Sequence, residues 1–216
     1  MSVRQVLGGL PPALRWSALG LIGFLVAVAV GLAVWLFLDH RADAARQAFG
    51  SASAAYRRTM AAATPDEAAL RGAAESLRQY VKDHPRSAQA GQAWYFLGNL
   101  EYQRRDFDAA RAAFDEAIRR SPAGTLGTLA RLGLGYAWEA RGDPQQALAA
   151  YQGALDGRTA KDFLYPELLL ATARTQEELK QTAAAIETYR RLLKDVPDLP
   201  RADEVRSRLA LLGASA

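Results

Sequence analysis

The stretch AWYFLGNLEYQRRDFDAARAAFDEAIRRSP, residues 93–122, contains the pattern that decides the fold. Its apolar side chains recur at three- and four-residue steps, which is the spacing of one face of an α-helix. Arg105 and Asp106 interrupt that periodicity near the middle, and Pro122 ends it. The stretch therefore predicts two helices joined by a short turn. It contains no Cys, no His and no glycine-rich loop, so its order indicates helix packing rather than a catalytic motif.

The same stretch resembles the tetratricopeptide repeat, whose pattern is W-x2-L-G-x2-Y in a first helix, then A-x3-F and A in a second, then P. Glu101 replaces the consensus Tyr, and Tyr102 lies beside it. The resemblance implies that Gly98 and Ala110 are small because two antiparallel helices approach each other there. The matching residues are Trp94, Leu97, Gly98, Ala110, Phe114, Ala117 and Pro122.

A second copy follows, in which Gly135 comes 37 residues after Gly98 and Trp138 takes the Tyr position. We therefore expect an all-α solenoid of about three to four helical hairpins over residues 64–216, with the best repeats at 91–124 and 128–161. The second copy matches at Gly135, Trp138, Ala147, Tyr151 and Ala154. Weaker copies match downstream at Ala173, Ala185, Tyr189, Leu192 and Pro197, and upstream at Ala61, Ala73, Leu77, Tyr80 and Pro85.

A separate feature is the uncharged run WSALGLIGFLVAVAVGLAVWLFL, residues 16–38. As a helix rising ~1.5 Å per residue it would be roughly 34 Å long, and a bilayer core is about 30 Å thick. The run predicts a transmembrane helix in contact with lipid, after a cytoplasmic leader at 1–15 and before a helical stalk at 39–63. The alternatives are a buried core helix and a signal peptide cleaved near Ala42-Asp43-Ala44, although the apolar part of a signal peptide is shorter.

Charges beside this run favour one orientation. Arg4 and Arg15 precede it without an acid, whereas the following residues mix both signs, so the amino terminus is expected inside and the domain outside. Within the run, Gly23, Ala27 and Gly31 lie four residues apart on one helix face. Small residues at that spacing permit close packing of another membrane helix, so a homo-oligomer is one expectation.

The remaining composition argues against an enzyme, a metal site, a cofactor and a nucleic-acid partner. There is no Cys, and neither His40 nor His84 has a second ligand at helical spacing. Residues 1–38 hold two of the 27 basic side chains and none of the 23 acidic ones, so the rest has a net charge of only +2. A cluster of acids is interpreted as a solvated face pairing with Arg, namely Glu101, Asp106, Asp108, Asp115 and Glu116.

In tetratricopeptide repeats the first helix of each pair lines the inner surface, which receives peptides or partner segments. The positions predicted to contact a partner are Tyr95, Phe96, Asn99, Tyr102, Tyr136 and Glu139, with Gly133, Glu167, Arg174 and Glu177 among their neighbours. Only Asn99 matches the clamp with which some family members hold a peptide carboxylate. The aromatic residues instead suit an extended chain with apolar side chains. The alternative is that a neighbouring helix, such as the last one, already covers them.

One membrane span followed by a small repeat domain resembles the ancillary subunit of the bacterial Sec translocon. That resemblance implies an inner-membrane protein with a cytoplasmic amino terminus and a periplasmic repeat domain. It also implies translocon subunits, a membrane-bound chaperone or secreted chains as partners. The stretch HPRSAQAGQAWYFLGNLEY is similar to outer-membrane-assembly repeat lipoproteins too, but their lipid-bearing Cys is missing. The alternative function is a structural tether or envelope-assembly factor that self-associates and binds no client.

Overall fold

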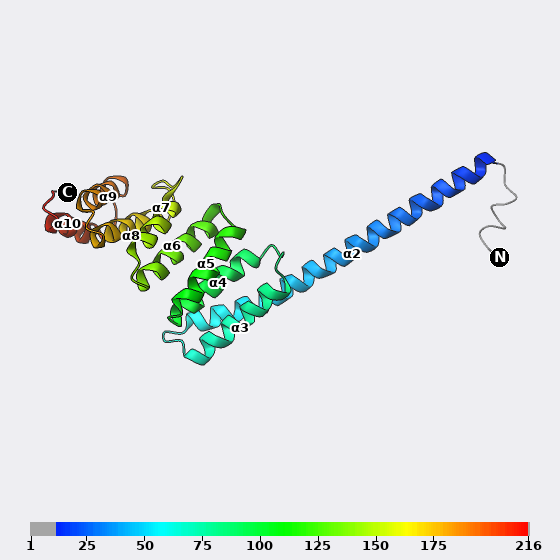
Figure 1. Cartoon of the computed structure of the whole chain (residues 1–216), viewed down its shortest axis with the longest axis horizontal. Helices are drawn as coiled ribbons and strands as arrows, with labels where there is room; N and C mark the ends of the chain where they lie inside the picture. The colour runs from blue at the N-terminus through cyan, green and yellow to red at the C-terminus, as the bar shows by residue number, and fades with distance from the viewer. Residues whose placement is uncertain (1–11, 216) are drawn as a thin grey trace. The chain divides into compact units, whose positions relative to one another are not determined.

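The computed structural model describes the backbone of residues 12–215 and the side chains of residues 20–215. Within these residues the regular structure consists of nine helices and no strand, which confirms the all-α prediction (Figure 1). Their bounds are α2 Pro12–Ala61, α3 Glu67–Asp83, α4 Ala90–Gln103, α5 Phe107–Arg120, α6 Gly124–Ala140, α7 Pro144–Leu155, α8 Tyr165–Glu178, α9 Thr182–Asp195 and α10 Ala202–Leu211.

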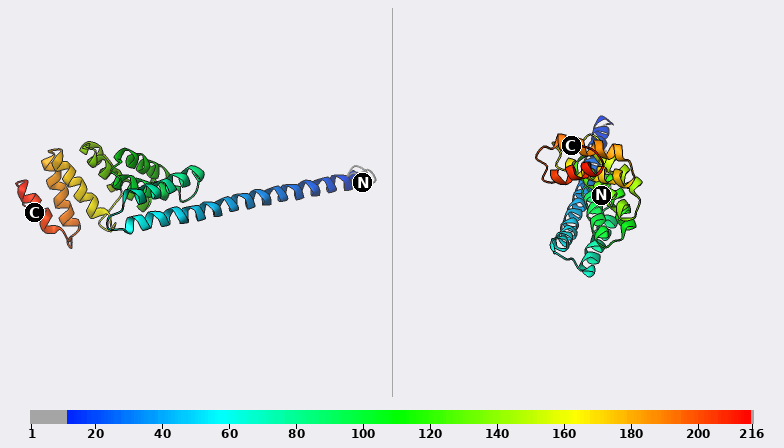
Figure 2. Two further views of the ribbon diagram at one scale, coloured as in Figure 1. Left: turned by 90° about the horizontal axis from the view of Figure 1, so that it is seen from below. Right: turned by 90° about the vertical axis from the view of Figure 1, so that its left-hand side faces the viewer.

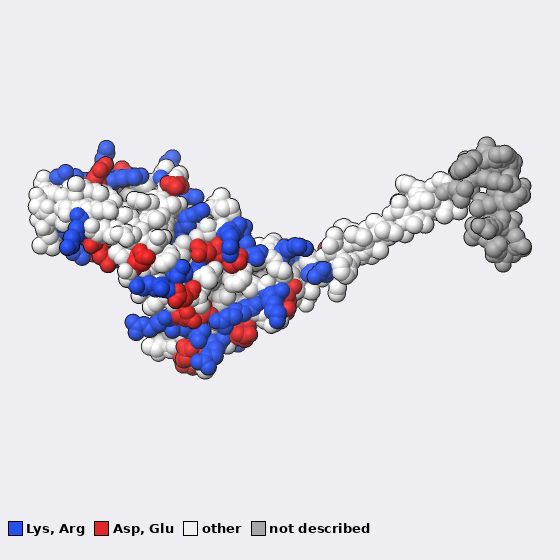
Figure 3. All heavy atoms as spheres, in the orientation of Figure 1, with Lys and Arg blue, Asp and Glu red and all other residues white. Residues whose placement is uncertain are grey.

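The chain divides into two compact units after Gln47. In the first unit, helix α2 exposes its large apolar side chains from Leu21 to Leu38, and each of them is at least 45% exposed. Figure 3 shows this segment without charged side chains. The helix is long and apolar enough to cross a membrane, with a mean hydropathy of 2.8 in its most apolar window and none of that window buried. A membrane anchor and a signal sequence share these properties.

The predicted leader at 1–15 and the predicted orientation rest on side chains outside the described residues. Arg4, with most of the expected leader at 1–15, lies before the described backbone, and the side chains of Arg15 and Trp16 are likewise not described. The small residues Gly23, Ala27 and Gly31 lie on exposed helix. A Cβ atom added at Gly23 or Gly31 would meet no atom within 4 Å.

The second unit starts at Ala48, so it includes residues that the sequence assigned to a stalk over 39–63. Ala52 is 3% exposed and packs with Leu70, Ala73 and Leu77 of α3, which makes residues 48–61 the first helix of a hairpin. The upstream repeat copy has a different register from the predicted one, because Ala61 is exposed at the end of α2. Helix α3 begins at Glu67, three residues after the start of the solenoid expected over 64–216.

Side-chain caps fix where the second helix of three hairpins begins. Asp66 precedes α3 and accepts a hydrogen bond from the Ala69 amide at 2.6 Å. Asp106 and Asp143 play the same part before α5 and α7, each with an amide nitrogen at 3.1 Å. An N-cap carboxylate satisfies a backbone N–H that the first helical turn leaves free, and it lies at the positive end of the helix dipole.

Successive helix pairs stack by placing an aromatic ring against glycine. A Cβ at Gly98 would lie 2.7 Å from the Phe114 ring, and one at Gly133 would lie 2.6 Å from the same ring. A Cβ at Gly135 would lie 2.1 Å from the Tyr151 ring. Phe114 therefore fills its own hairpin through Gly98 and joins α5 to the following hairpin through Gly133. In Figures 1 and 2 the helices from α3 to α10 accordingly follow one another as successive layers.

Candidate partner-binding surface

The surface considered first is the face of α4 that carries Tyr95, Phe96, Asn99 and Tyr102. All four side chains are half-buried. They lie on one side of the helix because steps of three and four residues return to the same face. The opposite side of α4 is buried, with Ala93, Leu97 and Leu100 at 3% exposure or less.

Two of these four residues contact the preceding hairpin. The ring of Phe96 stacks on that of Tyr56 in α2, with centroids 4.1 Å apart and an interplanar angle of 9°. The side-chain amide of Asn99 donates a hydrogen bond to the Tyr56 hydroxyl at 3.1 Å. Burial is the largest cause that raises the pKa of Tyr56, so this hydroxyl stays protonated. Phe96 and Asn99 therefore hold α2 to α4, and the end of α2 partly covers them.

Tyr95 and Tyr102 keep their hydroxyls available. The Tyr95 ring lies 6.1 Å from Phe114, and the Tyr102 ring lies 5.5 Å from Phe107, so both rings are held by packing. Within the described residues neither hydroxyl makes a hydrogen bond, and neither is a buried unsatisfied atom. A rigid ring with a free polar tip is a common contact in protein interfaces because little side-chain entropy is lost on binding.

The predicted contacts on α6 are engaged within the fold. The hydroxyl of Tyr136 donates to Glu167 at 2.6 Å. Glu139 accepts a hydrogen bond from Thr175 at 2.9 Å, so both residues tie α6 to α8. Burial and the Glu167 carboxylate raise the pKa of Tyr136 far above its ordinary value. Gly133, which was expected beside them on the partner-facing surface, lies against Phe114 instead.

The last helix covers α8 rather than the α4 aromatics. Val205 and Leu209 of α10 are fully buried in one cluster with Leu170 of α8 and Tyr189 of α9. Arg208 pairs with Glu177 at 3.6 Å, which adds a charged contact between α10 and α8. Of the neighbouring helices that could cover the α4 aromatics, the end of α2 contacts Phe96, whereas α10 packs at the carboxy-terminal end of the stack.

Glu101 is the residue whose role the sequence pattern hid. It was assigned to a solvated face, but it is only 1% exposed. Its carboxylate pairs with Arg78 of α3 and, at 2.7 Å, with Arg104 of its own helix. Arg104 also reaches Glu67 at 3.0 Å. An ion pair between two hairpins therefore takes the consensus Tyr position. The local signal that could have found it is an acid at a core position of the repeat with an Arg three residues later; Arg78 is 23 residues earlier and gives no local signal.

Comparison with known proteins places this geometry in a family. Two sequence profiles, each described as tetratricopeptide repeat, match residues 70–125 and 126–163, and residues 167–198, respectively. The chain is similar in structure to a putative kinesin light chain of Podospora anserina, described as having nearly identical TPR-like repeats. The TM-score is 0.59 and the sequence identity 12%, over 77% of this chain and 84% of that one, so the likeness concerns the fold alone.

No curated protein sequence matches the chain. The profile matches together cover more than half of it, and the aromatic–glycine contacts occur at the positions that define the repeat. Repeats of this kind typically serve as scaffolds for protein interaction and not as catalysts. This chain belongs to the tetratricopeptide-repeat family.

Proposed function

We propose that the protein is a membrane-anchored interaction scaffold, with the apolar segment 16–38 of helix α2 in the bilayer and the repeat unit on its outer side. The observation that carries the proposal is the pair Tyr95 and Tyr102, whose rings are fixed by packing and whose hydroxyls make no hydrogen bond within the part of the chain that the structure describes. They lie seven residues apart on one helix face, so an extended segment could contact both. The bound segment would present apolar side chains to the rings and backbone groups to the hydroxyls.

The proposed setting is the periplasmic face of a bacterial inner membrane, with the amino terminus in the cytoplasm. The exposed apolar helix supports the anchor. The order of one span and then a small repeat unit supports a role like that of the ancillary subunit of the Sec translocon. In that role the partners are translocon subunits, a membrane-bound chaperone or secreted chains as they emerge.

Site-specific photocrosslinking of the full chain in membranes tests this function. A photoreactive residue at Tyr102 should capture translocon subunits or secreted chains, and the same residue at Gln152 serves as the control because Gln152 is exposed on α7. Capture from Tyr102 of this chain alone would instead support the self-associating tether. Equal capture from both positions would mean that the tyrosine face has no special role.

Fractionation tests the anchor separately. The full chain should remain with membranes after a carbonate wash, and a protease added from the periplasmic side should degrade the repeat unit. Release by carbonate, together with a new amino terminus near Ala44, would identify the apolar run as a cleaved signal peptide. Degradation only from the cytoplasmic side would reverse the proposed orientation.

A further inference from the structure

The side of α4 that carries Tyr95, Asn99 and Tyr102, which we call the tyrosine face, has no exposed charge of its own. Glu101 is the one acidic or basic side chain among the 14 residues of α4, and it is only 1% exposed. A charged partner segment would lose hydration against this helix without gaining an ion pair. The charge of the helix is therefore complementary to an uncharged segment.

The neighbouring helix α6 carries two charged side chains, and both are engaged within the fold. Arg131 donates a hydrogen bond to the Pro122 carbonyl at 2.9 Å. Glu139 accepts a hydrogen bond from Thr175 at 2.9 Å. An ion pair with a partner would have to compete with these contacts, so α6 does not change the preference for an uncharged segment.

The polar groups of the tyrosine face suit a segment that offers carbonyl oxygens. Within the described residues the hydroxyls of Tyr95 and Tyr102 make no hydrogen bond, so each can donate one. Asn99 lies between them along the helix and uses one amide hydrogen on the Tyr56 hydroxyl, which leaves a second. A proline-rich segment carries carbonyl groups but few N–H groups, because proline has none. Its carbonyls therefore match these three donors.

The separation of the two tyrosines distinguishes between the conformations that a bound segment can have. Tyr95 and Tyr102 are seven residues apart, which is roughly 10.5 Å along α4. In a polyproline II helix, residues three apart point the same way and lie about 9.3 Å from each other. In a β-strand, side chains on one face are separated by roughly 6.6 Å or 13 Å. An α-helix also spans the distance, but its carbonyls are bonded internally and would leave the two hydroxyls unused.

The rings of this region form a firm platform for proline side chains. Phe96 stacks on Tyr56 with centroids 4.1 Å apart, and the Tyr95 ring lies 6.0 Å from Phe96. The Tyr102 ring lies 5.5 Å from that of Phe107. Aromatic surfaces of this kind bind polyproline II segments at a low entropic cost, because both partners are ordered before they meet.

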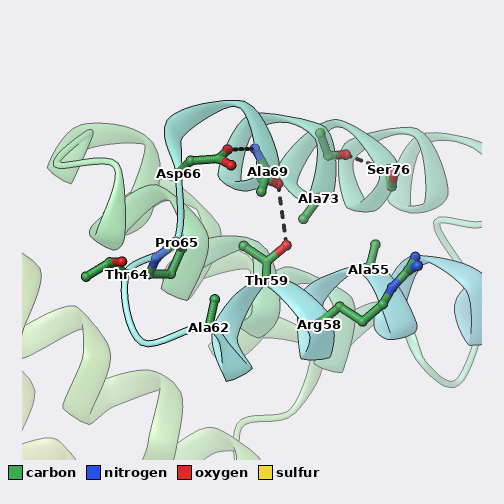
Figure 4. Close-up of a pocket in the computed structure, with 11 residues that line it drawn as sticks. Ala55, Arg58, Thr59, Ala62, Thr64, Pro65, Asp66, Ala69, Ala73 and Ser76 are labelled. Carbon is green, nitrogen blue, oxygen red and sulfur yellow. Dashed lines mark hydrogen bonds between the residues drawn. The ribbon is translucent and has the colours of Figure 1, made fainter.

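The open cavity between α2 and α3 lacks this combination of rings and donors. It has a volume of about 440 Å³ and is lined mostly by small side chains, with Arg58 and Asp66 as charged residues (Figure 4). Among the described residues that line it there is no aromatic side chain. The tyrosine face is therefore distinguished by its chemistry and not by its depth.

We infer that the tyrosine face recognises proline-rich segments of its partners in the polyproline II conformation. The inference rests on the proposed function, because it names the class of segment that the same face would bind. Such a segment is uncharged, has proline or another apolar residue at every third position, and places its carbonyl groups against the two hydroxyls and the Asn99 amide.

Peptide binding to the full chain in detergent micelles tests the inference. The probe is a fluorescently labelled, uncharged peptide of about twelve residues with proline at every third position, and its anisotropy reports binding. One comparison peptide has the same composition with proline at every fourth position. Two others lack proline, one built from β-branched residues and one from strong helix formers. The first peptide should bind at least about tenfold more tightly than each comparison peptide.

Variants of the two tyrosines locate the binding. Tyr95→Phe and Tyr102→Phe keep the ring and remove one donor, so each should weaken binding about two- to tenfold. Phe163→Ala is the matched aromatic control, because Phe163 is 73% exposed in the loop between α7 and α8, and it should leave the affinity unchanged. Circular dichroism checks that each variant remains folded.

Three results would each overturn the inference: equal or tighter binding of any comparison peptide, an unchanged affinity in both Phe variants, or an equal loss in Phe163→Ala. Photocrosslinking from Tyr102 separates this failure from failure of the proposed function. If no peptide binds but translocon subunits or secreted chains are captured, only the proline-rich class is wrong. If neither occurs, the tyrosine face is not a partner site.

Discussion

Replacing Gly98 by Ala tests whether close helix approach holds the repeats together. The added Cβ would lie 2.7 Å from two atoms of the Phe114 ring. The ring cannot simply retreat, because Gly133 lies against its other end, where an added Cβ would be 2.6 Å away. Phe114 is 1% exposed, so the neighbours around it leave no free space. The helices α4, α5 and α6 must therefore shift for the methyl group to fit.

Two opposing terms decide the magnitude. Overpacking of a dense core costs about 1–3 kcal/mol. Ala is favoured over Gly in a helix interior by about 1 kcal/mol. Gly72→Ala provides the matched control, since it gains the helix term without a contact within 4 Å. We expect Gly72→Ala to stabilise the protein, and the free energies of unfolding of the two variants to differ by about 1–3 kcal/mol.

The assay is thermal and urea unfolding of the full chain in detergent, followed by far-UV circular dichroism. A change of 1 kcal/mol moves Tm by roughly 2–4 °C for a domain of this size. Phe114→Leu completes a double-mutant cycle, in which Gly98→Ala should cost less once the ring is gone. If Gly98→Ala stabilised the protein as much as Gly72→Ala does, the argument from helix approach would be wrong.

Three further changes address the ion pairs and the proposed surface. Glu101→Gln removes the charge between Arg78 and Arg104. It should lower the free energy of unfolding by about 1–3 kcal/mol, measured from urea midpoints. An unchanged midpoint would show that the buried ion pair makes no net contribution to stability. A hydrogen bond from Arg104 lowers the pKa of Glu67. The interaction of Glu67 with Arg104 therefore stabilises the folded protein above the ordinary glutamate pKa, and this stabilisation is lost as the pH falls through the lowered pKa. The stability difference between the wild type and Glu67→Gln should therefore shrink from neutral pH to about pH 3; a constant difference would contradict this origin. With the photoreactive residue moved to Tyr95, Tyr102→Ala should reduce client capture by about tenfold, since an aromatic contact worth ~1.4 kcal/mol is removed. Because the ring also packs on Phe107, Tyr102→Ala should lower Tm as well, whereas Tyr102→Phe keeps the ring and should keep Tm; unchanged capture by Tyr102→Ala would mean that the ring is only structural.

The local pattern was enough to predict the best repeats. Gly98 and Phe114 are 16 residues apart, as are Gly135 and Tyr151, and both pairs meet in the structure. This works because one hairpin joins residues that are close in the chain, so the sizes of their side chains are read within a short window.

No such local signal marks the first hairpin. Helix α2 runs from Pro12 to Ala61 without a proline or a turn after its start, so nothing in the local pattern separates the apolar segment from residues 48–61. Its register against α3 depends on side chains such as Ala52 meeting Leu70 and Leu77. The register predicted from the later repeats placed Ala61, instead of Ala52, against α3.

For the predicted partner-binding surface, too, the sequence pattern predicted the helix face and the tertiary contacts decided which side chains stay free. The pattern placed six residues on one side of the first helices, but contacts between hairpins decide which of them are free. Phe96 and Asn99 meet Tyr56, which is more than 35 residues earlier, and Tyr136 meets Glu167, 31 residues later. Tyr95 and Tyr102 retain free hydroxyls within the described residues, and their role as contacts stays a prediction.

The amino-acid sequence by itself determined the helices, the repeat family and the apolar segment, because each depends on periodicity or composition within a few turns. Only the tertiary structure decided that Glu101 is a buried ion-pair partner and that α2 completes the first hairpin. The physical reason is that burial depends on which hairpin stacks on which, and that contact joins residues too far apart in the chain for any local pattern to specify.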